Sequence, residues 1–485
     1  MLDFRKILFV LFILLTGIIN KAFALDVVYP KTSTVNIFAP STFIVGNTDA
    51  KAKLTLNGKP VKVYPDGSFV VVVPLNNYKN SFILRSKSAN KYERKVITVT
   101  KAKPQARTAS TKYIPFQTNE KKYAKILADN IPIRTAPSDN ATRLTHLSTG
   151  TGVYLDGKKG NFYKVIFGDE YNCWIKQNYV NLLINTNERT IASIDKANVY
   201  EDNDAKYLTM ALSMPVAYQV KEAGNDISLT LFGINKNETF LKGMQAQKIF
   251  PTVILDSHTG DNMTLRFASQ DKIWGYECKY INNELVLKIR KKPTLIPDYP
   301  LKGITIALDA GHGGKELGAV GPTRVAEKDI NYKIAKKLEY ELKRAGANVV
   351  QVREGDVYMS LAERQTAAQN SNALIALSIH ANSLPDGQNP YIKHGTSVYY
   401  YNESSKELAD TIKKSMTTSM STKDDGTNKA SFAMNRSTAP LSVLIETAYM
   451  INPIEYAQLQ KNSFQETVAK SIREGLEQYL INNAK

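Results

Sequence analysis

From Leu301 to the C-terminus, short apolar runs alternate with amphipathic stretches of helical period. The stretch Lys328–Leu342 carries an apolar residue at every fourth position, and Gly346 follows it as a helix stop. The run Ala373–Ile379 is almost entirely apolar, which is typical of a strand covered on both faces. The other runs of strand length are Gly303–Leu308, Asn348–Val352, Thr396–Tyr401 and Leu441–Ile445. This alternation predicts an α/β domain over residues 301–485, with a mostly parallel, doubly wound sheet.

Local patterns also predict where some helices of this domain begin. Ser360 and Glu363 have the spacing of a capping box, and so do Ser463 and Glu466. Asn452 followed by Pro453 is typical of a cap residue and a proline in the first helical position. We therefore expect helices to start at these three places and at Ser404, which has Glu407 three residues later.

The N-terminal half of the chain has short strand-length runs separated by turn residues. Asn57-Gly58 lies between Ala52–Leu56 and Val61–Tyr64, and this pattern strongly predicts a β-hairpin. We expect three all-β modules, of which the first is an immunoglobulin-like sandwich. The predicted parts are the modules 25–100, 123–185 and 189–292, the linker 101–122 and a last linker at Ile296–Pro300.

Residues 1–24 have the features of a targeting segment. Arg5 and Lys6 precede the apolar run Ile7–Ile19, and Ala22-Phe23-Ala24 resembles a signal-peptide cleavage site. The run is short for a membrane span, which needs about 20 residues. We expect an exported mature chain that begins near Leu25, with no transmembrane anchor and no lipid-bearing N-terminal cysteine.

The basic charge of the chain is unevenly distributed. The 485 residues have a formal net charge of +18, of which residues 25–300 contribute +14 and residues 301–485 only +2. For an exported protein the available polyanions are wall and envelope polymers, so no nucleic-acid partner is expected. The basic modules would then hold the protein on an anionic wall, or the charge would serve solubility alone.

Four polar residues fall where predicted strands of the last domain end. His312 follows the first strand in a glycine-rich segment, and His380 and Glu446 each follow a later apolar run. Glu327 opens the helix after the glycine-rich segment. Because ligands bind at the carboxyl ends of the strands in open α/β sheets, all four residues can converge there. Two imidazoles with a carboxylate are a typical catalytic Zn²⁺ set, and a second carboxylate can move protons.

The segment 304–480 resembles the catalytic domain of zinc-dependent N-acetylmuramoyl-L-alanine amidases of the amidase C type. The motifs that carry this resemblance occur in family order: Asp-Ala-Gly-His312-Gly-Gly, Glu327-Lys-Asp-Ile-Asn331, Leu361-Ala-Glu-Arg364, Ser-Ile-His380-Ala-Asn382 and Leu444-Ile-Glu446-Thr-Ala-Tyr-Met-Ile-Asn452-Pro453. The resemblance implies that His312, Glu327 and His380 bind Zn²⁺ and that Glu446 is the catalytic carboxylate. By a weaker analogy, the substrate contacts would be Arg364, Asn382 and Arg436, the two arginines either holding a substrate carboxylate or packing structurally.

The sequence departs from the family pattern at two places near these motifs. Lys315-Glu316-Leu317 stands where the family commonly has x-Asp-Pro, and Ala448-Tyr449 stands where Gly-Phe is common. Neither departure touches a predicted metal ligand, so they bear on substrate preference and not on the reaction. The stretch Leu384–Ala439 is too short for the inhibitory inserted helix that some relatives carry.

Two of the N-terminal modules also resemble known families. Residues 189–292, with Trp274-Gly275-Tyr276, resemble the AMIN module found in front of cell-wall amidases. Residues 123–185 resemble the bacterial SH3-like domain through Ile131–Ser138, Gly160–Val165 and Cys173-Trp174-Ile175. Cys173 stands where that family usually has glycine, and we expect a buried thiol there and not a bridge to Cys278, the only other cysteine. Two cysteines exclude a disulfide-rich scaffold.

The three remaining histidines are His146, His258 and His394. The first two lack neighbours of ligand type, so we expect them at the surface. For His394 a surface position is expected, with an approach to the cleft as the alternative.

These observations together predict an exported peptidoglycan hydrolase that cleaves the amide between N-acetylmuramic acid and L-alanine, in wall turnover and daughter-cell separation. The alternatives are a catalytically inactive wall-binding homologue and a zinc peptidase that cuts within stem peptides. The periplasm is the expected location, because no C-terminal sorting tail is seen and an AMIN-like module suits periplasmic amidases. The sequence leaves open whether a protein activator takes part.

Overall fold

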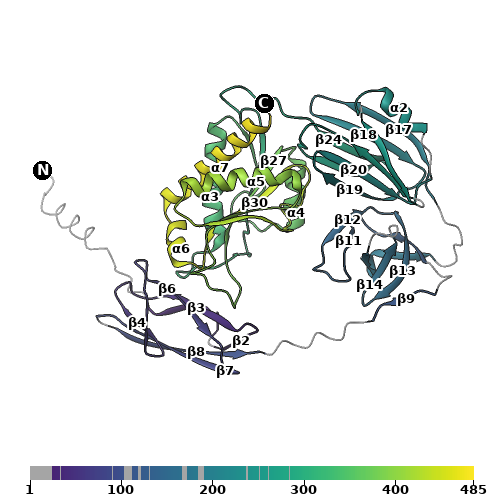
Figure 1. The fold of residues 1–485 in the computed structure, drawn as a ribbon. Helices are drawn as coiled ribbons and strands as arrows, with labels where there is room; N and C mark the ends of the chain where they lie inside the picture. The colour runs from purple at the N-terminus through teal and green to yellow at the C-terminus, as the bar shows by residue number, and fades with distance from the viewer. Residues whose placement is uncertain are drawn as a thin grey trace, which may run out of the picture.

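The computed structural model describes residues 24–484 except 33, 90, 103–111, 118–121, 130, 167–171, 184–190, 236–238, 251, 260–261 and 283. The predicted targeting segment 1–24 therefore lies outside the described residues, apart from Ala24. Most of the predicted linker 101–122 lies outside them as well. Figure 1 shows three β-rich parts and one α/β domain along the chain.

The first part is a sandwich of two sheets. Its strands are β1 (Asp26–Tyr29), β2 (Thr34–Ile37), β3 (Ser41–Asn47), β4 (Lys53–Leu56), β5 (Lys59–Val61), β6 (Ser68–Pro74), β7 (Lys79–Lys87) and β8 (Tyr92–Lys101). The sheet orders are β1-β3-β6 and β2-β8-β7-β4-β5. Ile44 and Phe69 of one sheet share a core with Leu84 and Val99 of the other. The predicted hairpin is confirmed, because β4 pairs with β5 around Asn57-Gly58, both with positive φ.

The second part is built on one sheet of the order β12-β11-β15-β14-β13-β10-β16, with β9 paired to β13. Its strands are β9 (Ile114–Pro115), β10 (Lys122–Ile126), β11 (Ile131–Arg134), β12 (Arg143–Leu147), β13 (Gly152–Lys159), β14 (Phe162–Ile166), β15 (Cys173–Lys176) and β16 (Val180–Leu183), with a 3₁₀ turn η1 (Gln177–Tyr179). Its core includes the fully buried Cys173. Its assignment to the SH3-like family stays a prediction.

The third part packs two four-stranded sheets, β17-β18-β24-β23 and β19-β20-β22-β21, around one core. The strands are β17 (Ile194–Glu201), β18 (Ala205–Leu212), β19 (Ala217–Ala223), β20 (Asp226–Phe232), β21 (Val253–Thr259), β22 (Asn262–Phe267), β23 (Tyr276–Ile281) and β24 (Glu284–Arg290). A short helix, α2 (Thr239–Ala246), interrupts the strands. As far as its residues are described, the N-terminal region is all-β apart from this helix and η1. The immunoglobulin-like and AMIN-like assignments stay predictions.

The C-terminal domain has a six-stranded sheet of the order β26-β25-β27-β30-β28-β29. Its strands are β25 (Thr305–Ala310), β26 (Asn348–Gln351), β27 (Ile375–Asn382), β28 (Thr396–Tyr400), β29 (Asp424–Lys429) and β30 (Leu441–Tyr449). All neighbouring pairs are parallel except β28 with β30, so the expected mostly parallel sheet is confirmed.

Helices cover both faces of this sheet, as the apolar strands require. They are α3 (Glu327–Arg344), α4 (Leu361–Asn370), α5 (Lys406–Ser419), α6 (Pro453–Leu459) and α7 (Asn462–Asn483), with a 3₁₀ turn η2 (Glu403–Ser405) before α5. Ile306 and Leu377 point to the side of α3, α5 and α7. Ala307 and Ala376, one residue away on the same strands, pack with Ala368 of α4 on the other side. The alternation of side chains along the strands therefore builds two cores.

The third part is joined to the C-terminal domain through Trp274. This side chain is 1% exposed and belongs to the core of the C-terminal domain, where its ring lies 5.7 Å from that of Tyr479. Glu222 accepts hydrogen bonds from the backbone N–H and the hydroxyl of Ser404. Trp274-Gly275-Tyr276 is thus part of an interface between the third part and the C-terminal domain.

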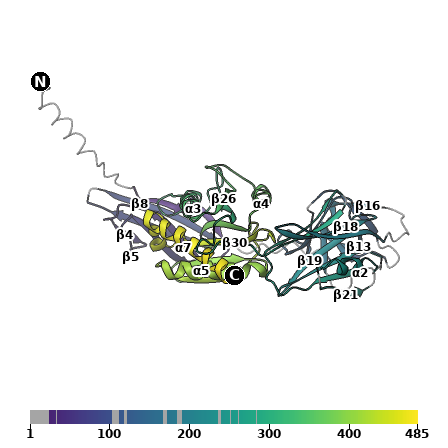
Figure 2. The same ribbon diagram turned by 90° about the horizontal axis from the view of Figure 1, so that it is seen from above.

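The first part docks on the C-terminal domain at the end of β30, on the side away from the second and third parts (Figures 1 and 2). Arg324 donates two hydrogen bonds to Asp26, and the hydroxyls of Tyr29 and Thr42 both donate to Asp386 at 2.6 and 2.5 Å. A buried apolar cluster also crosses this interface: Phe43, Val45 and Val70 with Tyr449 and Ile451. The first part is therefore held against the carboxyl edge of the sheet by polar and apolar contacts.

No helix within the described ranges is both long and apolar enough to cross a membrane.

Candidate metal and catalytic site

The structure brings the four expected residues together at the carboxyl edge of the sheet. His312 lies two residues after β25, His380 lies near the end of β27, and Glu327 is the first residue of α3. Glu446 is on β30, at the position paired with His380. Residues that are separated by up to 134 positions in sequence become neighbours, because parallel strands end at one edge.

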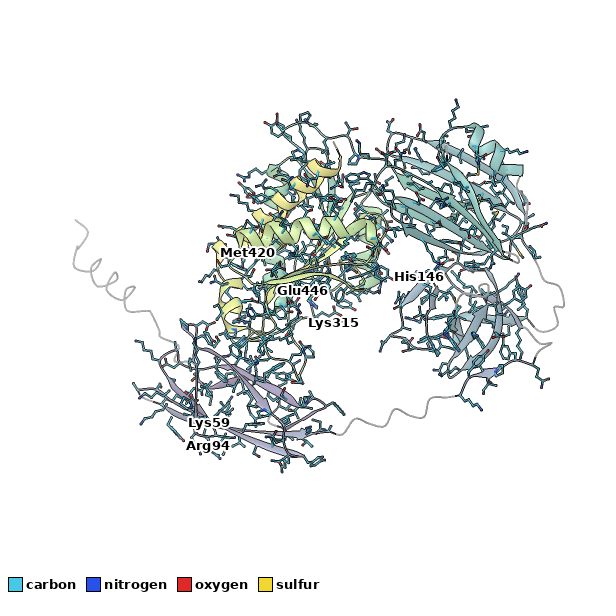
Figure 3. All side chains as sticks on the ribbon, viewed as in Figure 1. Lys59, Arg94, His146, Lys315, Met420 and Glu446 are labelled. Atoms are coloured by element: carbon cyan, nitrogen blue, oxygen red, sulfur yellow. The ribbon has the colours of Figure 1, made fainter. Side chains whose placement is uncertain are left out.

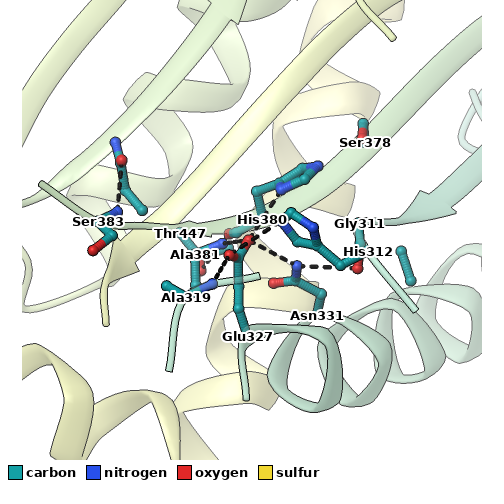
Figure 4. A network of polar contacts seen from close by, with 12 residues as sticks. Gly311, His312, Ala319, Glu327, Asn331, Ser378, His380, Ala381, Ser383 and Thr447 are labelled. Carbon is teal, nitrogen blue, oxygen red and sulfur yellow. Dashed lines mark hydrogen bonds and ion pairs between the residues drawn. The ribbon is translucent and has the colours of Figure 1, made fainter. Parts of the chain in front are cut away.

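Glu327 lies between the two imidazoles (Figure 4). Its Oε2 is 3.1 Å from Nε2 of His312, and its Oε1 is 3.0 Å from Nδ1 of His380. One ligand atom from each residue can be chosen so that all three lie within 4.8 Å of one another. Ligands of a tetrahedral zinc ion, each about 2.0–2.1 Å from the metal, lie roughly 3.3 Å apart. The spacing and the N,N,O donor chemistry therefore fit a single divalent transition metal.

Glu327 and His380 shift each other's pKa toward the charged form. Burial works against ionisation of Glu327, but hydrogen bonds from His312 and His380 outweigh it and hold the pKa of this carboxyl below its ordinary value. Burial alone would lower the pKa of His380, but the hydrogen bond and charge of Glu327 raise it to about 9. Without metal, the proton on His380 balances the carboxylate, so binding a cation there would displace this proton.

Three other groups hold the carboxylate of Glu327 in place, one of which is the backbone N–H of Ala381, which donates to Oε1 at 3.3 Å. Asn331, one helical turn further along α3, donates from Nδ2 to Oε1 at 3.1 Å, and the backbone N–H of Ala319 donates to Oε2 at 2.9 Å. Asn331 also donates to the carbonyl of Gly311. Asn331 was part of a sequence motif but was not among the expected site residues. Its spacing of four residues from Glu327 on one helix was the signal that could have identified it.

The glycines around His312 leave room for the cluster. A Cβ on Gly311 would lie 2.3 Å from the ring of His380, and a Cβ on Gly318 would lie 2.4 Å from Oε2 of Glu327. Gly318 also has φ +68, which disfavours other residues. The glycine-rich segment is therefore required by close packing around the ligands.

Glu446 has an unusual environment for a carboxylate. Its Oε2 is buried and has no hydrogen-bond partner in the described structure. Burial raises the pKa of Glu446 to about 7; the charge of His380 opposes this rise and that of Glu327 adds to it. A buried, unpartnered carboxylate that titrates near neutrality is suited to exchanging protons with a reacting group.

Arg364 does not line an open surface. Its side chain is 3% exposed, and Nη1 donates to Oδ1 of Asp309 at 2.5 Å and to the carbonyl of Ala310 at 2.9 Å. Nη2 donates to the carbonyl of His312. Of the two expectations for this residue, the structure therefore supports structural packing, since all these donors are used inside the chain. Ser378 completes this network by donating to Oδ2 of Asp309.

The other two residues expected to contact the substrate are Asn382 and Arg436. Asn382 ends β27, two residues after His380, and its Oδ1 accepts a hydrogen bond from the N–H of Ser383. Arg436 precedes the first residue of β30, whereas Glu446 is the sixth, so Arg436 lies toward the opposite edge of the sheet. Its carbonyl accepts a hydrogen bond from Nδ2 of Asn402, and its role, as a substrate contact or in structural packing, stays a prediction.

The remaining histidines and cysteines stay outside the cluster. His394 pairs through Nδ1 with the buried Glu455 at 2.7 Å, and His146 is half-buried, where burial and the charge of Arg143 lower its pKa to about 4. The expected surface position of His146 is therefore wrong, and the side chain of His258 lies outside the described residues. Cys173 and Cys278 are both free in the structure, and Cys173 is buried.

Comparisons with known proteins find relatives of the C-terminal domain. The model of the N-acetylmuramoyl-L-alanine amidase family matches residues 306–478. N-acetylmuramoyl-L-alanine amidase LytC of Bacillus subtilis is 34% identical over 184 residues, which are 37% of this chain and 36% of LytC. The uncharacterized protein YqiI of the same organism is 33% identical over 184 residues, which are 86% of that protein.

A further relative and a solved structure each match 37% of this chain. The probable cell wall amidase LytH of Staphylococcus epidermidis is 32% identical over 182 residues, or 60% of its length. The structure of N-acetylmuramoyl-L-alanine amidase AmiC2 of Nostoc punctiforme is 33% identical, with a TM-score of 0.35, over 37% of this chain and 99% of that chain. The chain thus spans about a third of LytC and three fifths of LytH, but most of YqiI. Through residues 306–478, the chain belongs to the N-acetylmuramoyl-L-alanine amidase family.

Proposed function

We propose that this protein is a peptidoglycan hydrolase that cleaves the amide bond between N-acetylmuramic acid and the L-alanine of the stem peptide. The observation that carries the proposal is the position of Glu446. Its buried Oε2 has no partner, and its strand position is paired with that of His380 in the His312–Glu327–His380 cluster. A carboxylate with a free oxygen next to a metal-type ligand set is the arrangement that amide hydrolysis by activated water requires.

We assign Zn²⁺ as the metal, with His312, Glu327 and His380 as its protein ligands. Two imidazoles and one carboxylate, with a fourth position left to water, are a usual set for catalytic zinc. When bound, zinc supplies a Lewis acid that polarises the scissile carbonyl and lowers the pKa of bound water toward about 7. Asn331 and the N–H of Ala319 hold the Glu327 carboxylate and so keep its orientation.

In this proposal Glu446 moves the proton. Its free Oε2 accepts a proton from the attacking water, and the resulting acid gives it to the nitrogen of the departing L-alanine. A pKa of about 7 makes both steps accessible near neutral pH, since neither protonation state is strongly favoured. The peptide then leaves with a free amino group, and the lactyl carbonyl of the glycan becomes a carboxylate.

The experiment is a digestion of purified peptidoglycan by the full-length protein loaded with zinc, followed by mass analysis of the soluble products. Release of intact stem peptides with an N-terminal alanine supports the proposal. Shortened peptides would identify a peptidase, and the absence of any product, from intact wall and from soluble muropeptides alike, would identify an inactive wall-binding homologue. Cleavage by the purified chain alone would also show that no protein activator is required.

We further propose that the protein is exported and acts in the cell envelope, with the periplasm as the location predicted from sequence. Two observations support the envelope: LytH, a similar protein, is named a probable cell wall amidase, and residues 25–300 carry a net charge of +14. A positive surface favours binding to anionic wall polymers. Fractionation of cells that express the full chain tests this location.

A further inference from the structure

The loop between the metal ligands His312 and Glu327 is braced at its start. The backbone N–H of Gly314 donates to Oδ1 of Asp356 at 2.7 Å. Lys328 donates from Nζ to the carbonyl of Gly314 at 3.0 Å and to Oδ2 of Asp356 at 2.5 Å. A Cβ on Gly314 would lie 2.6 Å from the backbone nitrogen of Tyr358, so the loop lies directly on the segment that contains Tyr358. This loop is therefore held in one place relative to the metal ligands.

Lys315 projects from this braced loop. Its Nζ lies over the ring of Tyr358, 4.2 Å from the ring centroid, and no carboxylate among the described residues lies within 4.0 Å of it. The neighbouring lysine of the same region, Lys328, is neutralised by Asp356. The aromatic face holds the ammonium group without cancelling its charge, so Lys315 stays available to an anion.

The surroundings of Lys315 suit a ligand that is part peptide. Tyr358 is 43% exposed. Val357, which precedes it, is 48% exposed, and Leu317, two residues after Lys315, is 45% exposed. Figure 3 shows Lys315 and Glu446 on the same side of the C-terminal domain. Lys315 follows the ligand His312 by three residues, and three residues span at most about 10 Å.

Peptidoglycan offers an anion at the right distance from the scissile bond. The second residue of the stem peptide is a D-glutamate joined through its side chain, so its main-chain carboxylate is free unless the cell amidates it. This carboxylate lies about two residues beyond the bond to be cut, which corresponds to roughly 7 Å in an extended peptide. A lysine side chain on the loop that begins at a metal ligand can cover that distance.

We propose that Lys315, held on the ring of Tyr358, forms a subsite for the free carboxylate of the second stem-peptide residue. This inference rests on the proposed amidase function and concerns its substrate preference. Lys315 stands at the variable position of the family pattern, directly before Glu316 and Leu317, where the sequence departs from it. It makes the enzyme select acidic stem peptides over amidated ones.

The test compares two soluble substrates with the full-length zinc enzyme: N-acetylmuramoyl-L-alanyl-D-isoglutamate and the same compound with D-isoglutamine. The wild-type protein is expected to have a kcat/KM about fivefold higher for the acid, mainly through a lower KM, as for a partly exposed ion pair. Lys315→Gln is expected to lower kcat/KM for the acid so that the ratio of the two substrates falls to about one. Lys315→Arg is expected to keep the ratio above two.

Lys333→Gln is the matched control, because Lys333 is an exposed lysine on α3 with no role in this loop. It is expected to leave the wild-type ratio unchanged, and all variants are checked for unchanged zinc content. Equal kcat/KM values for the two substrates in the wild type, or an unchanged ratio in Lys315→Gln, would overturn the subsite. Absence of cleavage of both substrates and of intact peptidoglycan would instead overturn the amidase function, so the two failures are distinguishable.

Discussion

His380 and Glu446 occupy paired positions on the neighbouring parallel strands β27 and β30. One is a member of the metal-type cluster, and the other carries a buried carboxylate oxygen without a partner. Neighbouring strands are about 4.8 Å apart, so the two side chains start from adjacent points of the backbone. In the proposed function, the cation ligand His380 and the proton acceptor Glu446 thus lie on two adjacent strands.

The first prediction separates these two tasks. Glu446→Gln removes the proton acceptor but leaves His312, Glu327 and His380 in place, so zinc should stay bound at wild-type stoichiometry. Loss of general-base function is expected to reduce kcat by at least about 10²-fold. Metal analysis and release of stem peptides from peptidoglycan measure the two properties on the same sample. Loss of zinc from this variant would show that Glu446 is itself a ligand.

The ligands themselves should behave in the opposite way. His312→Ala and His380→Ala are each expected to lose zinc and activity together, because two remaining protein ligands hold a divalent ion far more weakly than three. Asn331→Ala removes only a support of Glu327, so its zinc affinity should fall by about 10–100-fold. Competition with a chromogenic chelator ranks these variants. Wild-type zinc affinity in either histidine variant would contradict the assigned ligand set.

The raised pKa of Glu446 predicts that the stability of the metal-free protein depends on pH. An unfolded glutamate titrates near 4.3, whereas burial raises the pKa of Glu446 to about 7 in the folded protein. Between these values the folded state binds more protons than the unfolded state, so its stability falls as pH rises. Glu446→Gln removes this dependence. Its Tm after chelation should exceed that of the wild type at pH 8, and the difference should shrink toward pH 5; an equal difference at both pH values would contradict the assignment.

Trp274 should connect the stability of the third part to that of the C-terminal domain. Its ring fills a core position against Tyr479, so Trp274→Ala is expected to lower the free energy of unfolding of the C-terminal domain by about 3–5 kcal/mol. Trp174→Ala, in the second part, serves as the comparison, because Trp174 does not belong to that core. Hydrogen exchange of β27 and β30 measures the effect locally. Equal protection in the two variants would show that the two parts are independent.

The contact of Trp274 with the C-terminal domain also affects the stability of a truncated protein. From sequence, a truncation that begins near Leu301 would be a freestanding catalytic domain that cleaves small muropeptides. The structure shows that such a truncation would remove Trp274 from the core and uncover Tyr449 and Ile451, which are 1% and 7% exposed in the full chain. We therefore expect the truncated protein to be less stable than the full chain.

The charge distribution predicts salt-dependent binding to the wall. Residues 25–300 carry +14, and exposed charges are screened over about 8–10 Å at physiological ionic strength. The inactive Glu446→Gln protein, which cannot digest its ligand, is expected to sediment with purified sacculi at low salt and progressively less as sodium chloride rises. Binding that does not change with salt would indicate a specific pocket for glycan or peptide in one of the β modules.

The chemistry of the site could be predicted from the sequence to a large extent. Apolar runs mark the strands, and the residue after a buried strand must lie at the carboxyl edge of a parallel sheet, so His312, His380 and Glu446 were expected at one place. Ser360 and Glu363 form the predicted capping box. The same pattern at Ser463 is wrong, because α7 begins one residue earlier, with Lys461 in the cap position, after the chain turns from α6.

What only the tertiary structure decided is the role of side chains whose partners are distant in sequence. The sequence around an arginine in a helix does not indicate which groups its side chain will bind. The burial of Arg364 against Asp309 depends on how α4 packs on β25. The carboxylate of Asp386 is likewise bound by Tyr29 and Thr42, more than 340 residues away, through docking of a separate module. Local pattern determines strands, helices and the edge at which ligands gather, because those depend on the backbone and on nearby residues. Which polar groups remain free for a substrate depends on the packing of whole elements against one another, and that is settled only when the chain is folded.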